Sequence, residues 1–150
     1  VPPAYTLIAN EFGIPDKLLY AVALTESLHP EYKKPWPWAA NIDGKAFYFE
    51  SRDEMFLYLS RIARNKSNFD VGIMQTNWKW QKHRFDSLRD ATDPLTNIRA
   101  GAAYLTELYK KYGSFDTAVG HYHSPGNEVL AEAYRQRVKA KLRLILAGNY

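Results

Sequence analysis

The chain has 150 residues, 46% hydrophobic and 24% charged, which is typical of one soluble globular domain with a sizeable core. It has no cysteine, which excludes a disulfide framework and a thiolate metal site, and no apolar run of membrane-spanning length. The net charge of +4 favours an anionic partner such as nucleic acid, a membrane surface or cell wall, and aromatic residues at 15% often line sugar-binding grooves as well as cores.

Two helices are predicted at the start of the chain. Ala4–Phe12 has one apolar side, and a second helix begins at Pro15-Asp16, a pair typical of a first helical turn. Glu26 closes the apolar stripe of the second helix, on the side that we expect to face the interior. Burial raises the pKa of a carboxyl group and suits it to donate a proton near neutral pH. The alternative is a carboxylate at the rim, solvated or paired with an arginine, and this segment leaves both interpretations open.

The following part of the chain mixes irregular and regular segments. Three prolines make His29–Trp38 a loop or an extended segment. Asp43-Gly44 is a preferred two-residue turn and predicts a β-hairpin within Trp38–Phe49. Ser51 and Glu54 form a capping box, which predicts that a helix begins there.

Helices dominate the second half. Asn65–Trp80 has neither a helical nor a strand period, so we expect a loop with small local turns. Helices are then predicted from Asp93 to Gly113, from Ser114 to Ser124 and from Glu128 to Leu146, the last with faces rich in Lys and Arg. The sequence therefore predicts a single domain over residues 1–150, α+β and mostly α-helical, with one small β-hairpin.

A polar stretch around Gly72 carries groups suited to binding. Gly72 lets the backbone approach a ligand closely or adopt a positive φ. Asp70 supplies a second carboxylate, and the side-chain amides of Gln75 and Asn77 both donate and accept hydrogen bonds. The alternative is a capped turn in which Asp70 and Asn77 satisfy the loop backbone, and the stretch by itself favours that alternative.

Three short motifs follow one another along the chain. Glu26-Ser27 closes a helix, Gly72-Ile73-Met74-Gln75 forms a turn, and Ala118–His123 lies on a later helix. The set resembles the lytic transglycosylases of the soluble (SLT, family 1) type, which have a Glu-Ser pair, a Gly-Leu-Met-Gln turn and an Ala-Tyr-Asn motif. Asn97–Leu105 resembles the long helix that this family has between the last two motifs.

The resemblance implies a lysozyme-like α+β fold and an enzyme that cuts the MurNAc-β-1,4-GlcNAc bond of peptidoglycan. Glu26 would be the sole catalytic acid and base, protonating the glycosidic oxygen and then taking the proton of the MurNAc C6 hydroxyl. The product would be a 1,6-anhydroMurNAc end, formed without water, metal or cofactor. The resemblance also implies a monomer in the periplasm or otherwise exported, and the sequence, which begins at Val1-Pro2-Pro3, shows no signal-peptide pattern.

Further site residues are implied by the same resemblance. Met74 and Gln75 would line the floor of the substrate cleft. Tyr122 would hydrogen-bond near Glu26 and help to place it, and Tyr104 would lie on the same wall of the cleft.

Two histidines depart from the family pattern. His123 occupies the Asn position after Tyr122, and His121 stands in place of Ala. His123 would still donate a hydrogen bond to the substrate, with a charge that depends on pH. Because residues two apart on a helix face different ways, we expect no metal site at these histidines.

The segment between Glu26 and Gly72 is longer than in compact members of the family. This arrangement resembles the branch found with conjugative elements and type IV secretion, which implies a secretion or conjugation apparatus as a partner. Trp36 and Trp38 in this segment are expected either to stack on sugar rings or to be buried against the hairpin.

Asp70 is a third departure. In the run Ser67-x-x-Asp70-x-Gly72 it resembles the second catalytic carboxylate of the C-type lysozymes, where an ionised aspartate accompanies the acidic glutamate. Asp70 would then stabilise an oxocarbenium-like transition state, or it would only brace the turn. Ser67 would offer its hydroxyl to the acyl groups of the substrate.

Three other functions are alternatives to a lytic transglycosylase. One is a hydrolytic muramidase that uses Glu26 with Asp70, and another is a non-catalytic cell-wall-binding module with the same fold. Nucleic-acid binding is the least favoured, because Lys and Arg are spread along the chain and no recognition-helix motif is present.

Overall fold

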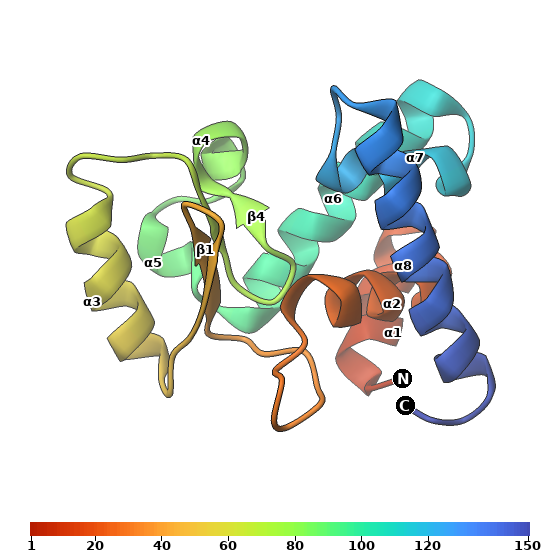
Figure 1. The fold of residues 1–150 in the computed structure, drawn as a ribbon, viewed down its shortest axis with the longest axis horizontal. Coiled ribbons are helices and arrows are strands. Elements are labelled where there is room, and N and C mark those ends of the chain that lie inside the picture. The colour runs from red at the N-terminus through yellow and green to blue at the C-terminus, as the bar shows by residue number, and fades with distance from the viewer. The chain divides into compact units, whose positions relative to one another are not determined.

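The computed structural model describes residues 1–150 (Figure 1). Contacts between residues group the chain into two compact units. One unit comprises Val1–Thr25 and Ala102–Tyr150, and the other comprises Glu26–Gly101. The chain passes from one unit to the other within two helices, α2 (Asp16–Ser27) and α6 (Pro94–Tyr112). None of the helices combines the length and the apolar character needed to cross a membrane.

The N-terminal helices of the first unit form where the sequence predicts them. α1 (Pro3–Phe12) has a proline at its start, where a fixed φ suits the first turn, and ends at Gly13 with a left-handed φ of 71°. The apolar stripe of α2 is confirmed, because Leu19, Val22 and Ala23 are fully buried.

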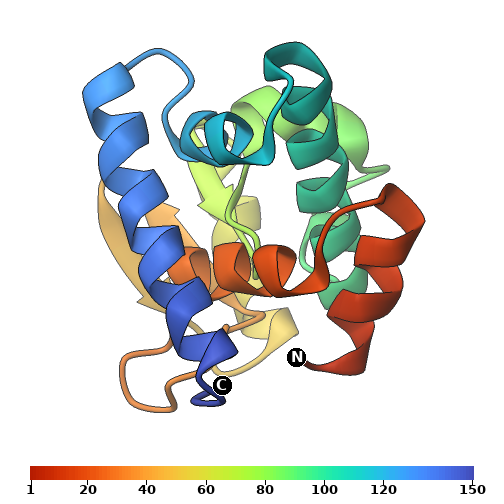
Figure 2. The ribbon, with the colours of Figure 1, turned by 90° about the vertical axis from the view of Figure 1, so that its right-hand side faces the viewer.

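The long C-terminal helices also have the predicted bounds. α6 ends one residue before Gly113, α7 spans Phe115–His123, and α8 spans Glu128–Leu146. Side-chain caps at Ser114 and Asn127 start the last two, each accepting a backbone N–H three residues on. Figure 2 shows α8, in blue, beside α7, and the two helices pack against each other.

The second unit contains a four-stranded antiparallel sheet with the strand order β2-β1-β3-β4. β1 (Ala39–Ile42) and β2 (Lys45–Tyr48) form the predicted hairpin, whose turn consists of Asp43 and Gly44. Both turn residues have positive φ, 54° and 78°, as a tight two-residue hairpin turn requires.

The prediction of a loop over Asn65–Trp80 is wrong in part, because two strands and a helical turn form there. β3 (Phe69–Val71) pairs with β1, β4 (Thr76–Asn77) pairs with β3, and α4 (Trp78–Gln81) follows. The strands have three and two residues, too few to display a period in the sequence. They form because β1, distant along the chain, pairs with β3, and β3 in turn pairs with β4.

α3 (Arg52–Ile62) begins at Ser51, whose hydroxyl oxygen accepts the N–H of Glu54 at 3.1 Å as predicted. The Glu54 carboxylate accepts the N–H of Glu50 at 3.4 Å, one residue before the position that a capping box would use. The helix buries its apolar side in a core that it shares with the sheet: Ala40, Ile42, Phe49, Met55, Leu59, Phe69, Val71 and Ala91.

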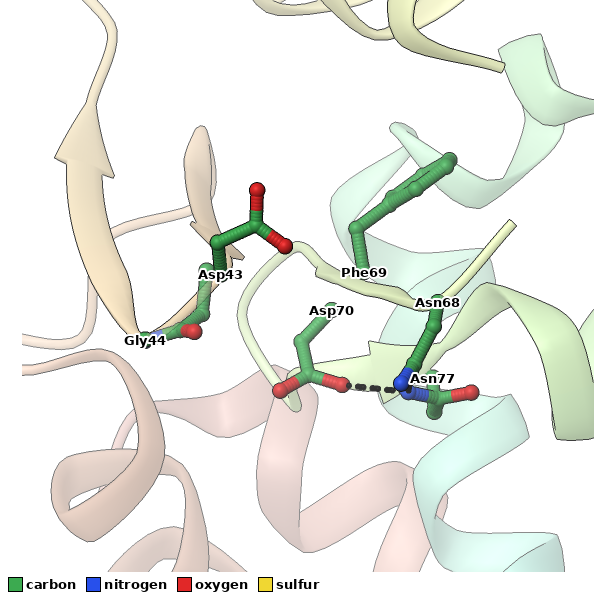
Figure 3. A pocket seen from close by; sticks show the side chains of 7 residues that line it. Asp43, Gly44, Asn68, Phe69, Asp70 and Asn77 are labelled. Carbon is green, nitrogen blue, oxygen red and sulfur yellow. Dashed lines mark hydrogen bonds between the residues drawn. The ribbon is translucent and has the colours of Figure 1, made fainter. Parts of the chain in front are cut away.

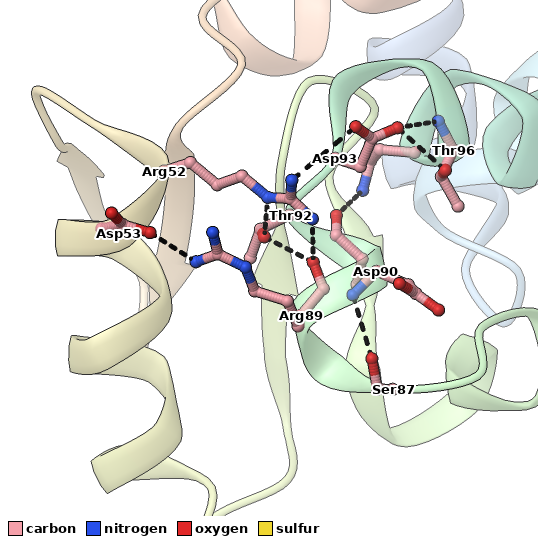
Figure 4. Close-up of polar contacts among 10 residues, drawn as sticks. Arg52, Asp53, Ser87, Arg89, Asp90, Thr92, Asp93 and Thr96 are labelled. Carbon is pink, nitrogen blue, oxygen red and sulfur yellow. Dashed lines mark hydrogen bonds and ion pairs between the residues drawn. The ribbon is translucent and has the colours of Figure 1, made fainter.

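A polar network centred on Arg52 ties α3 to the segment that precedes α6 (Figure 4). That segment contains the short helices η1 (Lys82–Arg84) and α5 (Leu88–Ala91). Arg52 donates to the Thr92 hydroxyl and to the Arg89 carbonyl oxygen, both at 2.9 Å, and pairs with Asp93 at 3.9 Å. Asp93 in turn accepts the backbone N–H of Thr96 at 2.9 Å. This N–H, the Thr96 hydroxyl and the charge of Arg52 lower the pKa of Asp93.

Candidate active site

The last turn of α2 carries Glu26 and Ser27. Glu26 is half-buried, a position between the buried carboxyl group and the solvated rim carboxylate that the sequence left open. Ser27 is buried, and its hydroxyl donates a hydrogen bond of 2.6 Å to the carbonyl oxygen of Ile73. The Ser27 carbonyl oxygen accepts the N–H of Trp36 at 2.8 Å. The helix end that carries Glu26 is therefore fixed to the Gly72–Gln75 turn and to the loop that follows the helix.

The Gly72–Gln75 turn has an unusual backbone. Gly72 has a φ of 81°, and Gln75 has a φ of 50°, a left-handed conformation that is uncommon for a residue other than glycine. The side-chain amide of Gln75 bends back and donates to the carbonyl oxygens of Gly72 (2.8 Å) and Ala39 (3.2 Å). Strained backbone of this kind persists where the surroundings hold it, and it is frequent at functional sites.

Asn97, in the first turns of α6, holds the turn from the other side. Its Oδ1 accepts the N–H of Met74 at 2.8 Å, and its Nδ2 donates to the carbonyl oxygens of Val71 and Ala91, both at 2.9 Å. The Asn97 side chain is 1% exposed, so these bonds are made away from water. A buried amide with this many partners fixes the position of the turn and costs much to remove.

Two glycines allow this close packing. A Cβ atom on Gly72 would lie 2.6 Å from Nδ2 of Asn97, and a Cβ atom on Gly101 would lie 2.8 Å from the Met74 side chain. Met74, a residue of the turn, is fully buried with its side chain against Gly101. Gly72 is thus required both for its φ and for the space that it leaves.

Asp70 lies on β3 and lines a polar pocket at one end of the sheet (Figure 3). Asn77, opposite it on β4, donates from Nδ2 to Asp70 at 3.0 Å and to Oδ1 of Asn68 at 2.8 Å. Asp43, from the hairpin turn, lines the same pocket and forms an ion pair with Lys66. The pocket thus combines two carboxylates with side-chain amides, groups that can bind the hydroxyls of a sugar.

Ser67 is exposed in the segment that leads into β3 and does not line this pocket.

The two tryptophans after α2 have different environments. Trp38 packs against the core of the second unit, as the burial alternative predicts. Trp36 donates from its indole N–H to the carbonyl oxygen of Phe49 at 2.7 Å and remains partly exposed.

The first unit holds the other predicted site residues. Tyr104 of α6 and Tyr122 of α7 are neighbours, with ring centroids 5.3 Å apart. His123 is exposed and stacks on Tyr134 of α8 at 4.7 Å. His121 is buried, and its Nε2 lies 3.5 Å from a carboxylate oxygen of Glu128. No group of three or more His, Asp or Glu side chains is arranged to hold a metal ion.

A comparison with protein-family models gives the family of the chain. The model described as Transglycosylase SLT domain matches residues 6–145, nearly the whole chain. The chain belongs to the SLT transglycosylase family. The predicted resemblance to the SLT family and the lysozyme-like α+β fold class are therefore confirmed. Neither a curated protein nor a solved structure matches the chain.

Membership of the SLT family gives the class of reaction. SLT domains are lytic transglycosylases, and their substrate is peptidoglycan. The matched range includes Glu26-Ser27, the Gly72–Gln75 turn and the Ala118–His123 motif.

The sequence did not indicate the part played by Asn97. The available signal was the helical spacing of Asn97. It lies four positions before Gly101 and eight before Leu105, so this polar residue falls on the buried face of α6.

Proposed function

We propose that Glu26 is the catalytic acid and base of this SLT transglycosylase. The observation that carries the proposal is the hydrogen bond from Ser27 to the Ile73 carbonyl oxygen, which joins the helix end bearing Glu26 to the second family motif. The half-buried position of Glu26 also supports it, because a general acid and base must be within reach of the substrate.

In the proposed reaction, protonated Glu26 donates its proton to the oxygen of the MurNAc-β-1,4-GlcNAc bond. The bond between that oxygen and C1 of MurNAc breaks, which leaves positive charge at C1 in an oxocarbenium-like transition state. The Glu26 carboxylate then removes the proton of the C6 hydroxyl, and O6 forms a bond to C1. The product is a 1,6-anhydroMurNAc end, Glu26 is protonated again, and no water is consumed.

Further residues are proposed to bind substrate. In the second unit, Gln75 and Ser67 contact the glycan directly, and Met74, whose side chain is buried, acts by anchoring the turn. In the first unit we assign substrate-binding roles to three residues: Tyr104, Tyr122 and His123.

The decisive experiment digests purified peptidoglycan with the protein and with its Glu26→Gln variant. We expect the protein to release anhydro products, one water lighter in mass than hydrolysis products, and the variant to release almost none. Glu11→Gln, at an exposed glutamate of α1, is the matched control and should retain activity. Wall clearing by Glu26→Gln at the normal rate would contradict the proposal.

A hydrolytic muramidase is the second candidate, favoured by the position of Asp70 in the polar pocket. In that reaction Asp70 would stabilise the transition state while water attacks C1. The same mass analysis distinguishes the two, because hydrolysis leaves only reducing MurNAc ends.

The location and assembly of the protein are proposed from its substrate and from the segment after Glu26. We propose a periplasmic or otherwise exported monomer that opens the wall locally for a secretion or conjugation apparatus. Size-exclusion chromatography with light scattering tests the monomer, and a secretion assay in a deletion strain tests the partner.

A further inference from the structure

A second pocket lies in the second unit, and none of the residues assigned above lines it. It has a volume of about 380 Å³ and is bordered by the loop after α2 and by the end of the hairpin. Five ring side chains line it: His29, Tyr32, Trp36, Tyr48 and Phe49. Its size is within the range of pockets that bind small ligands, which begins at about 300 Å³.

The loop that forms one side of this pocket is fixed by its own hydrogen bonds. Leu28 forms an isolated β-bridge with Pro35, and the N–H of His29 donates to the Lys34 carbonyl oxygen at 2.9 Å. Nδ1 of His29 accepts the backbone N–H groups of Glu31 (3.1 Å) and the next residue (3.2 Å). An imidazole that accepts at Nδ1 carries its proton on Nε2.

The rings are held in place before any ligand binds. His29 lies at the centre, with ring centroids 4.5 Å from Tyr32, 4.7 Å from Trp36 and 5.0 Å from Tyr48. The bond from the Trp36 indole N–H to Phe49 fixes the plane of the largest ring. Preorganised rings lose little conformational entropy on binding, so contacts with them contribute more fully to affinity.

The charge of the pocket indicates what it binds. Its two charged lining residues, Glu31 and Glu50, are both acidic, although the chain as a whole carries a net charge of +4. Aromatic faces and carboxylates together favour a positively charged group. The ammonium of Lys34 already lies 5.9 Å from the centroid of the Trp36 ring, which shows that a ring of this cluster accepts such a group.

We propose that this pocket binds an ammonium group on an aliphatic chain. On peptidoglycan the ligand is the side-chain amine of a diamino acid in the stem peptide, an identification that rests on the proposed function. The carboxylates of Glu31 and Glu50 bind the charge, and the rings of Tyr32 and Trp36 contact the methylene groups. The enzyme would then bind its glycan strand partly through the peptide that the strand carries.

The test measures binding without cleavage. The inactive Glu26→Gln variant is titrated with a synthetic Ala-Glu-Lys-Ala peptide and with the same peptide acetylated on the lysine amine. We expect acetylation to weaken binding at least about tenfold, because it removes the charge. Equal affinity for the two peptides would overturn the proposal, as would binding of chitotetraose in the pocket in place of the peptide.

Variants in the pocket locate the binding. In the Glu26→Gln background, Trp36→Ala and the double change Glu31→Gln with Glu50→Gln should each weaken peptide binding at least about tenfold. The double change is at exposed residues and leaves the Trp36 hydrogen bond to Phe49 intact, so it reports on binding if Trp36→Ala fails to fold. Trp80→Ala is the matched control, since Trp80 is 65% exposed and lies outside the pocket.

The outcomes separate this proposal from the proposed function. If the Glu26→Gln variant binds both peptides with equal affinity while the unmodified protein still forms anhydro products, the pocket proposal alone is overturned. Peptide binding that requires the amine and the two glutamates supports the pocket, whichever product the cleavage assay finds.

Discussion

The hydroxyl of Ser27 donates a hydrogen bond of 2.6 Å to the carbonyl oxygen of Ile73, 46 residues further along the chain. Because Ser27 follows Glu26 directly, this bond positions the end of α2 relative to the Gly72–Gln75 turn. The two family motifs are thus parts of one hydrogen-bonded unit. This relationship gives the serine of the Glu-Ser pair a positioning role.

Ser27→Ala should lower both stability and activity. The change leaves the buried Ile73 carbonyl oxygen without this donor, which costs about 2 kcal/mol. Thr25→Ala is the control, because the Thr25 hydroxyl bonds only to Ala21 in its own helix and its loss should cost under about 0.5 kcal/mol. Urea denaturation and wall-clearing assays measure the two effects. Equal stability of the two variants would show that the bond to Ile73 is unimportant.

Asn97→Ala should destabilise the protein by about 3 kcal/mol or more, because it removes several buried hydrogen bonds together. Asn97→Asp should not restore stability. It keeps the acceptor for Met74 but directs a carboxylate oxygen at the carbonyl oxygens of Val71 and Ala91. Asn10→Ala, at an exposed position of α1, is the control. A stable Asn97→Asp protein at neutral pH would contradict this account of the turn.

A pair of glycine variants separates backbone strain from lack of space. Gly44 and Gly72 have nearly equal φ, 78° and 81°, but a Cβ atom on Gly44 meets nothing within 4 Å. Gly44→Ala should therefore cost about 1 kcal/mol, from the left-handed backbone alone. Gly72→Ala should cost about 3 kcal/mol or more, because its Cβ atom also collides with Asn97. Denaturation midpoints measure both, and equal losses would exclude the collision.

The stability of the second unit should depend on pH through Asp93. Its pKa is lowered in the folded protein, first by the backbone N–H of Thr96, with Arg52 also contributing. A lowered folded-state pKa gives stability that is complete above the unfolded value near 4 and is lost as the pH falls through the folded value. Asp93→Asn should therefore be less stable than the unmodified protein at pH 6, with the difference narrowing below about pH 4. Asp86→Asn, at an exposed residue, is the control, and a difference for Asp93→Asn that stays constant with pH would contradict the assignment.

Asp70→Asn tests the role of the second carboxylate. The amide keeps an oxygen that accepts the hydrogen bond of Asn77, so the change removes the charge and preserves the brace. If Glu26 acts alone, we expect cleavage to fall by less than about tenfold, which corresponds to about 1.4 kcal/mol. A loss of a hundredfold or more, absent in the control Asp43→Asn from the same pocket, would favour the muramidase reaction.

Local signals in the sequence determined most of the helices and the hairpin. A helix start depends on a few neighbouring residues, such as the caps Ser51, Ser114 and Asn127, and the hairpin turn depends on the left-handed backbone of Asp43 and Gly44. These interactions join residues a few positions apart, so they can be read without knowledge of the fold. The family was also predicted from sequence, because its motifs are short and ordered.

The tertiary structure decided the features that depend on distant partners. β3 and β4 are too short to form alone and exist because β1 pairs with β3. The bonds of Ser27 and Asn97 to the Gly72–Gln75 turn join separate parts of the chain, and no local pattern predicts them. The charge and rings of the second pocket likewise come together only when the loop after α2 closes against the hairpin. The sequence thus named Glu26 and the turn, and the fold supplied the contacts that hold them.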